Sequence, residues 1–137
     1  MADSIQRKGQ CLCGKVFLGT KVEKKVGVCH CGMCRAWGGG PMFAVQASER
    51  PHFEGGEHIN SYDTSDWAER AFCQHCGSHL YYRIKASDEY IVPVGLFRDQ
   101  SGFELDHQIF IDHKPAYYAF ANDTTNMTEA EVFAKYS

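Results

Sequence analysis

Short hydrophobic runs, separated by turn-forming residues roughly every eight to twelve positions, dominate the chain. Runs of this length, bounded by glycine, proline and small polar residues, are typical of β-strands. The expected strands are 15–20, 25–30, 42–46, 59–62, 69–72, 80–84, 90–94, 104–111 and 116–121. The pattern therefore predicts a mainly β fold.

The one helical pattern lies at the C-terminus, at about 128–136. Thr128, followed three positions later by Glu131, matches a capping box. Val132, Phe133 and Tyr136 then form a short apolar stripe. We expect a short helix that packs this stripe against a sheet.

Length and composition indicate an ordinary globular protein. The 137 residues contain 44% hydrophobic and 23% charged residues, which suffices for a real core. We find no internal repeat or linker, so we expect a single domain over 1–137, with its core at about 9–121 and the terminal helix beyond it. A monomer or a homodimer is compatible with this size.

Charge and segment composition restrict the partners. The formal net charge is −3 and the basic residues are scattered, which argues against a nucleic-acid partner. Residues 1–10 are polar, unlike a signal peptide, and no stretch is long enough to span a membrane. We therefore expect a cytoplasmic protein with no membrane contact, whose thiols stay reduced.

All seven cysteines fall into three tight clusters, which are Cys11-Leu12-Cys13-Gly14, Cys29-His30-Cys31-Gly32-Met33-Cys34 and Cys73-Gln74-His75-Cys76-Gly77. Thiols one or two residues apart can share a metal ion, and the glycine after two of the clusters tolerates the positive φ that a tight ligand turn needs. In a reducing compartment this spacing favours zinc over disulfides. Four thiols would close one tetrahedral site, and three would hold a second zinc with one position open.

The middle cluster leaves alternatives. Its three thiols can reach one ion from a single loop, as in catalytic zinc sites that keep a position for water or substrate. A fourth ligand would instead make it a closed structural site, and the candidates are His30, His75 and His79. One of the thiols would otherwise only pack as a small apolar group. His30 is also a candidate proton carrier.

The order and spacing of these cysteines resemble one known family. The segments Gly9-Gln10-Cys11-x-Cys13-Gly14-x-Val16, Cys29-His30-Cys31-x-x-Cys34-Arg35 and Phe72-Cys73-x-x-Cys76-Gly77-Ser78-x-Leu80 are similar to the glutathione-dependent formaldehyde-activating enzymes, also called the centromere-protein-V/Gfa domain. The resemblance runs from about Gly9 to Phe120 and so covers most of the chain.

This resemblance implies an Mss4-like, zinc-bound β fold of packed antiparallel sheets, with two zinc ions per chain. A structural zinc would be held by Cys11, Cys13, Cys73 and Cys76, and a second, more labile zinc by Cys29, Cys31 and Cys34. It also implies a carbon–sulfur lyase of the S-(hydroxymethyl)glutathione synthase type, which joins formaldehyde to glutathione. Gly38–Pro41 departs from the family pattern, and this departure concerns the glutathione site rather than the zinc sites.

Three hypotheses for the function follow. In the first, the open zinc site deprotonates a small-molecule thiol, glutathione or a similar compound, and the thiolate adds to an aldehyde carbonyl. In the second, the chain is a non-catalytic zinc module that binds a protein. In the third, it is a zinc or thiol buffer, whose triplet exchanges metal without accelerating a reaction.

Overall fold

The structure is a computed structural model that describes residues 4–136. These residues divide into two compact units. The first unit comprises 4–24 and Ala44–Gly102, and the second comprises Lys25–Phe43 and 103–136. The expectation that the whole chain is one domain stays a prediction.

The first unit contains a three-stranded antiparallel sheet in the order β1-β2-β5. Its strands are β1 (Ser4–Gln10), β2 (Phe17–Glu23) and β5 (His52–Glu54). β2 buries alternate residues, as a strand with one solvated face does. Gly9 in β1 faces a neighbouring backbone, because a Cβ built there would lie 2.4 Å from the carbonyl oxygen of Leu96. Only glycine fits this approach.

The other strands of the first unit follow one another as an antiparallel series in the order β4-β9-β8-β7-β6. The strands are β4 (Met42–Gln46), which enters this unit at Ala44, β6 (Ile59–Asp63), β7 (Ala68–Cys73), β8 (His79–Ile84) and β9 (Glu89–Pro93), with 3-10 turns η1 (Gly56–His58) and η2 (Val94–Leu96). Val16 and Leu80 are fully buried in one cluster with Cys11 and Cys73, and Phe53, Ile59 and Tyr81 pack against it. Three of the expected strands, 15–20, 59–62 and 80–84, therefore meet around two of the cysteine clusters.

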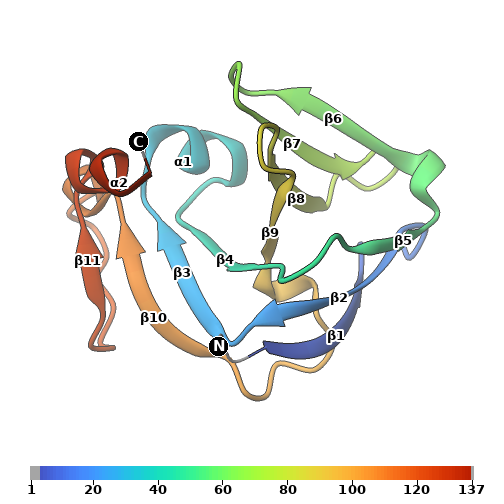
Figure 1. The fold of residues 1–137 in the computed structure, drawn as a ribbon, viewed down its shortest axis with the longest axis horizontal. Coiled ribbons are helices and arrows are strands. Elements are labelled where there is room, and N and C mark those ends of the chain that lie inside the picture. The colour runs from blue at the N-terminus through green and yellow to red at the C-terminus, as the bar shows by residue number, and fades with distance from the viewer. Residues whose placement is uncertain (1–3, 137) are drawn as a thin grey trace. The chain divides into compact units, whose positions relative to one another are not determined.

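The second unit is built on three parallel strands, β3 (Lys25–Cys29), β10 (Glu104–Ile109) and β11 (Thr125–Met127). The helix α1 (Gly32–Gly38) follows β3, the turn η3 (Ile111–His113) follows β10, and the helix α2 (Glu129–Tyr136) follows β11. All three connections therefore leave from the carboxyl ends of the strands, which lie at the same edge (Figure 1). The expectation of antiparallel pairing holds in the first unit and is wrong for these three strands.

The mainly β prediction is confirmed, and the expected strand 42–46 coincides with β4. The strand expected at 116–121 is wrong, because this segment has no ladder partner and Lys114 Nζ instead donates to the carbonyl oxygen of Tyr118. The expectation that only the C-terminus is helical is also wrong, since α1 follows the middle cysteine cluster. β1, β5 and β11 were not expected.

The C-terminal helix and its capping box are confirmed. Thr128 Oγ1 accepts from the backbone N–H of Glu131 at 3.2 Å, and Glu131 Oε1 accepts from the N–H of Thr128 at 2.9 Å. Val132 is buried, and the Phe133 ring meets Phe110 edge-on. Over the described residues, neither helix has the length and apolar character that crossing a membrane requires.

Candidate metal centre

Two turns of the first unit bring four thiols together. Cys11 and Cys13 follow β1, while Cys73 ends β7 and Cys76 lies in the turn to β8. In each turn the glycine after the second cysteine, Gly14 or Gly77, has a positive φ of 81° or 78°. Its N–H returns to the carbonyl of the first cysteine, at 3.1 Å for Gly14 and 2.8 Å for Gly77. The expected role of these glycines is confirmed.

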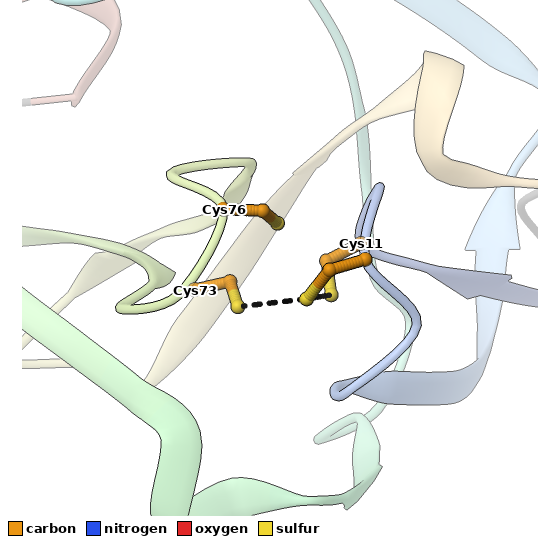
Figure 2. A group of neighbouring side chains, drawn as sticks. Cys11, Cys73 and Cys76 are labelled. Carbon is orange, nitrogen blue, oxygen red and sulfur yellow. Dashed lines mark hydrogen bonds between the residues drawn. The ribbon is translucent and has the colours of Figure 1, made fainter.

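The distances between the thiols match a tetrahedral zinc. The Sγ atoms of Cys11 and Cys13 lie 3.6 Å apart, and those of Cys13 and Cys73 lie 3.7 Å apart. Four sulfurs bound at about 2.3 Å to one tetrahedral ion would be about 3.8 Å from one another. All four Sγ atoms lie within 4.8 Å of each other, and Figure 2 shows the side chains of Cys11, Cys73 and Cys76 turned toward a common point. The cluster therefore fits one ion.

The protein also supplies donors that stabilise the thiolate form. The backbone N–H of Val16 donates to Cys11 Sγ at 3.3 Å. The Ser78 hydroxyl and backbone amide lower the pKa of Cys76 to about 5. Cys11 and Cys73 are only 1% and 0% exposed, whereas Cys13 is exposed and Cys76 is half-buried. A partly buried, partly ionised set of thiols calls for a cation.

Three further thiols gather at the carboxyl end of β3. Cys29 ends the strand, Cys31 is the residue before α1, and Cys34 lies in the first turn of that helix. Cys31 Sγ caps α1 by accepting from the N–H of Cys34 at 3.4 Å. One Sγ atom from each residue fits within a 4.8 Å group, so this triplet can also hold a metal ion.

The chemistry of the triplet also fits a cation. Hydrogen bonds with the thiols of Cys31 and Cys34, together with burial, raise the pKa of Cys29 far above its ordinary value. Three adjacent thiolates repel one another, and a bound metal ion removes that repulsion. Among the described residues no fourth ligating atom joins the group. That composition is the three-ligand type of zinc site rather than the closed four-ligand type.

His30 does not serve as the fourth ligand of the triplet in this structure. Its side chain is fully buried, its Nε2 lies 2.7 Å from Gln108 Oε1, and its Nδ1 lies 2.6 Å from the Tyr118 hydroxyl. Burial lowers the pKa of His30. Both ring nitrogens of His30 therefore form hydrogen bonds with residues other than the cysteines. Sequence reasoning missed Gln108 and Tyr118, because only the parallel sheet and the 114–124 segment bring them to His30.

The other candidate histidine ligands have different partners. His75 Nε2 lies 3.0 Å from His58 Nδ1, and His75 and His79 are absent from the metal-binding groups found in the described residues. His113 Nε2 lies 2.8 Å from Glu129 Oε1, and Asp112 Oδ1 accepts from the N–H of Glu129 at 3.0 Å. Asp112, His113 and Glu129 also lie close enough to hold an ion. Their contacts are those of an ion pair and a helix cap.

A shallow groove lies apart from this chemistry. It has a volume of about 380 Å³ and is lined by Glu23 with residues 46–50 and 87–90, so it contains no cysteine. Arg50 Nη1 and Asp88 Oδ2 form an ion pair at the rim of the groove, with a separation of 3.2 Å. Among the described residues, the thiol clusters lie outside this groove and could each hold a metal ion.

Comparisons with known proteins agree with the cysteine arrangement. An uncharacterized lyase of Schizosaccharomyces pombe is 35% identical over 127 residues, which cover 91% of this chain and 93% of the relative. A crystal structure of a Rhodobacter sphaeroides protein superposes with a TM-score of 0.58 at 26% identity, covering 66% of this chain and 87% of that chain. The family described as glutathione-dependent formaldehyde-activating enzyme matches residues 6–113. The chain belongs to this family.

Proposed function

We propose that this protein is a zinc-dependent carbon–sulfur lyase that acts on thiol–aldehyde adducts, with glutathione and formaldehyde or close analogues as its substrates. Family membership and the lyase name of the fungal relative support this class of reaction. The observation that carries the proposal is the triplet, in which three thiols converge without a fourth ligand among the described residues. The family reaction joins a thiol to an aldehyde: the S–C bond forms and the thiol proton ends on the former carbonyl oxygen.

Cys11, Cys13, Cys73 and Cys76 would hold a structural zinc. Cys13 and Cys73 are sixty positions apart in the sequence, so an ion bound there closes a long loop of the first unit. Zinc binding energy at such a site contributes directly to folding. Its four protein ligands would fill a tetrahedral site and leave no position for a substrate.

Cys29, Cys31 and Cys34 would hold the second zinc. When bound there, zinc would supply the positive charge that makes a substrate thiol a thiolate at neutral pH. The chain itself fixes the three ligands. Cys31 is held by its capping bond to α1, and Arg35 Nε donates to the carbonyl oxygen of His30 at 3.2 Å, which secures the turn between β3 and α1.

The triplet lies at the edge of the parallel sheet where β3, β10 and β11 end, and this edge is favourable for binding a ligand. Ligand sites of open parallel sheets lie outside the carboxyl ends of their strands, because several connections converge there. Here those connections are α1, η3 with the 114–124 segment, and α2. A small thiol and an aldehyde would meet the triplet at this edge.

The test is acceleration of adduct exchange by wild type and by Cys31→Ser. Serine is a preferred helix N-cap, so this substitution removes one thiol and retains the cap of α1. The rate of exchange between glutathione and S-hydroxymethylglutathione can be followed by two-dimensional NMR exchange spectroscopy. We expect wild type to exceed the uncatalysed rate and Cys31→Ser to fall to it. Met33→Leu is a matched control, because Met33 lies in the same helix and is half exposed.

Both alternative functions predict that wild type does not accelerate adduct exchange. A zinc or thiol buffer would exchange metal at the triplet and leave the adduct rate at its uncatalysed value. A non-catalytic binding module would give the same rate for wild type and Cys31→Ser. Either result would contradict the proposed enzyme.

A further inference from the structure

Two histidine rings of the first unit lie against each other beside the turn that carries Cys73 and Cys76. His75 Nε2 lies 3.0 Å from His58 Nδ1, and this contact is exposed. His58 is the last residue of η1, and His75 lies between the two cysteines in the turn from β7 to β8. The four-thiol cluster and the thiol triplet contain neither ring. The pair is therefore a group of potential ligands that the proposed zinc sites do not use.

The backbone positions the two histidines. β6 and β7 are paired, and just beyond that pairing the N–H of Gln74 donates to the carbonyl oxygen of His58 at 2.8 Å. The N–H of His58 donates in turn to the carbonyl oxygen of Gly55 at 3.0 Å. His58 is thus held at both of its backbone polar groups, and His75 directly follows one of the residues that hold it. Because the fold already brings the rings together, an ion bound between them would not have to order two separate segments.

The orientation of the rings differs from that of a straight hydrogen bond. The ring centroids of His58 and His75 are 4.7 Å apart, and the ring planes meet at 67°. A straight N–H···N bond of the observed 3.0 Å length would separate the centroids by about 5.3 Å, because each centroid lies about 1.15 Å behind its nitrogen. The ring axes are therefore bent away from the line that joins the two nitrogens.

The two separations agree with binding of one ion by both nitrogens. With nitrogen–metal bonds of about 2.0–2.1 Å, a nitrogen–nitrogen distance of 3.0 Å corresponds to an angle of about 95° at the ion. Rings directed at such an ion would have centroids about 4.7 Å apart, which matches the observed separation. An angle near 90° suits square-planar or octahedral ions, whereas tetrahedral zinc prefers about 109°. The geometry therefore favours an ion such as Cu²⁺ or Ni²⁺.

The far side of the His58 ring also has the surroundings of a ligand histidine. The other ring nitrogen, Nε2, lies 3.9 Å from Glu57 Oε2, a distance at which the contact is electrostatic. A carboxylate on the far nitrogen is a common partner of metal-bound histidine, because it favours the proton there and leaves the near nitrogen as the ligand. The same carboxylate places a negative charge close to a bound cation, which stabilises the ion.

We propose that His58 and His75 form a two-histidine site for one divalent transition-metal ion that prefers nitrogen ligands, with water at its remaining positions. The site is separate from the two cysteine sites and does not depend on the lyase reaction. Because only two protein ligands hold the ion, it would exchange readily with solvent. A bound ion would link η1 to the turn that carries Cys73 and Cys76.

Nickel binding to the zinc-loaded protein, measured by isothermal titration calorimetry, tests the site. Wild type should bind one Ni²⁺ per chain. His58→Asn and His75→Asn should each lower the affinity by at least about tenfold, the cost that even the loss of an outer partner of a ligand can have. Two separate single-histidine sites would instead bind two ions, and each variant would keep one of them. That result would overturn the shared site.

His52→Asn and His113→Asn are matched controls. His52 is an exposed histidine on β5, and His113 belongs to the group that it forms with Asp112 and Glu129. Both variants should keep the nickel affinity and stoichiometry of wild type. Loss of nickel binding in His113→Asn, with wild-type binding in His58→Asn, would place the ion at that other group and overturn the proposal.

His75 is next to the proposed zinc ligand Cys76, so the zinc content and circular dichroism of every variant are measured before the titration. If His75→Asn loses zinc, His58→Asn still decides the outcome, because His58 lies outside the cysteine clusters. Zinc-loaded His58→Asn that binds nickel as tightly as wild type would overturn the proposal.

Urea unfolding of the zinc-loaded protein provides a second measurement. A ligand that binds only the folded state stabilises it, so Ni²⁺ should raise the midpoint of wild type and leave that of His58→Asn unchanged. Mg²⁺ prefers oxygen ligands and should change neither midpoint. An equal rise with Ni²⁺ in wild type and His58→Asn would contradict the site. Neither measurement uses adduct exchange, so failure of the lyase proposal would leave this site standing.

Discussion

The Sγ atoms of Cys13 and Cys73 lie 3.7 Å apart, although sixty positions of the chain separate the two residues. Cys73 is fully buried, and its neighbours in the core include Val16 and Leu80. The four-thiol cluster is therefore part of the packing of the first unit as well as its candidate metal site. Folding and metal binding should be coupled there.

Cys76→Ser should prevent cooperative folding or reduce stability severely. Structural zinc sites contribute about 10–16 kcal/mol of apparent binding energy in small zinc domains, which exceeds the stability of many domains. Urea unfolding followed by circular dichroism at 25 °C measures the effect. Cys31→Ser should still unfold cooperatively, because its triplet lies within one short segment. A Cys76→Ser midpoint equal to that of wild type would contradict a structural role for the four-thiol site.

Gly9→Ala should destabilise the first unit by about 1–3 kcal/mol, as overpacking of a fixed backbone does. The added Cβ would lie 2.4 Å from the Leu96 carbonyl oxygen, so one of two backbones must move. Gly19→Ala on the neighbouring strand is the control, because the nearest atom to its Cβ is Lys8 Cγ at 3.9 Å. Equal urea midpoints for the two variants would show that the close approach at Gly9 is absent in solution.

Thr128→Ala should cost about 1 kcal/mol of stability, the typical effect of losing an N-cap. The substitution removes the acceptor for the Glu131 N–H. Glu131→Gln keeps an oxygen that can accept from the Thr128 N–H, so it should cost less. Thermal unfolding compares both variants with wild type. A larger loss for Glu131→Gln than for Thr128→Ala would contradict this description of the helix start.

Acid should weaken the exposed contact between Asp99 and Ser101, because it protonates the Asp99 carboxylate. The Ser101 hydroxyl and backbone N–H, at 2.6 and 2.9 Å, lower the pKa of Asp99 below its ordinary value of 3.8. A carboxyl with a lowered folded-state pKa stabilises the protein above its unfolded-state pKa, and this contribution is lost as the pH falls through the folded-state pKa. Ser101→Ala should raise the Asp99 pKa in an NMR titration. An unchanged Asp99 titration in this variant would refute the contact.

The sequence predicted the strands whose apolar runs are bounded by turn residues. The run Met42–Gln46 coincides with β4, and the expected strand 25–30 begins with β3 and extends one residue beyond it. β1 escaped prediction because Ser4–Gln10 is mostly polar and lacks a hydrophobic run. The segment 116–121 has the composition of a strand, but Tyr118 directs its hydroxyl to His30 and its carbonyl to Lys114. Hydrogen bonds of this kind cannot be predicted from hydrophobic periodicity.

The candidate metal ligands were accessible from the sequence because short spacing alone brings most of them together. The remaining step, the meeting of the Cys11 and Cys73 clusters, required a resemblance to a family, and the structure places their thiols within one group. Gln108, Thr124 and Tyr118 could not be found in this way. Parallel pairing of β3 and β10 brings Gln108 toward His30, Thr124 contacts Gln108, and the 114–124 segment brings Tyr118 to His30. No local pattern predicts these placements.

Chelation should separate the two proposed metal sites. A moderate chelator should remove zinc first from the triplet, whose three thiols would leave one position open to a competing ligand. The four-thiol site supplies all four ligands, two of them from the buried Cys11 and Cys73, and should release its ion only with unfolding. Zinc release followed with a colorimetric indicator, alongside circular dichroism, should therefore show a first phase without loss of structure. Simultaneous loss of all zinc and of structure would argue against two different sites.

The most direct test of the account is the zinc content of the intact protein, measured by native mass spectrometry. Wild type should carry two zinc ions per chain, and a Cys31→Ser, Cys34→Ser double variant should remain folded with one. A wild type that binds a single zinc, or a double variant that keeps two, would contradict the division of the seven cysteines into a four-thiol structural site and a three-thiol reactive site.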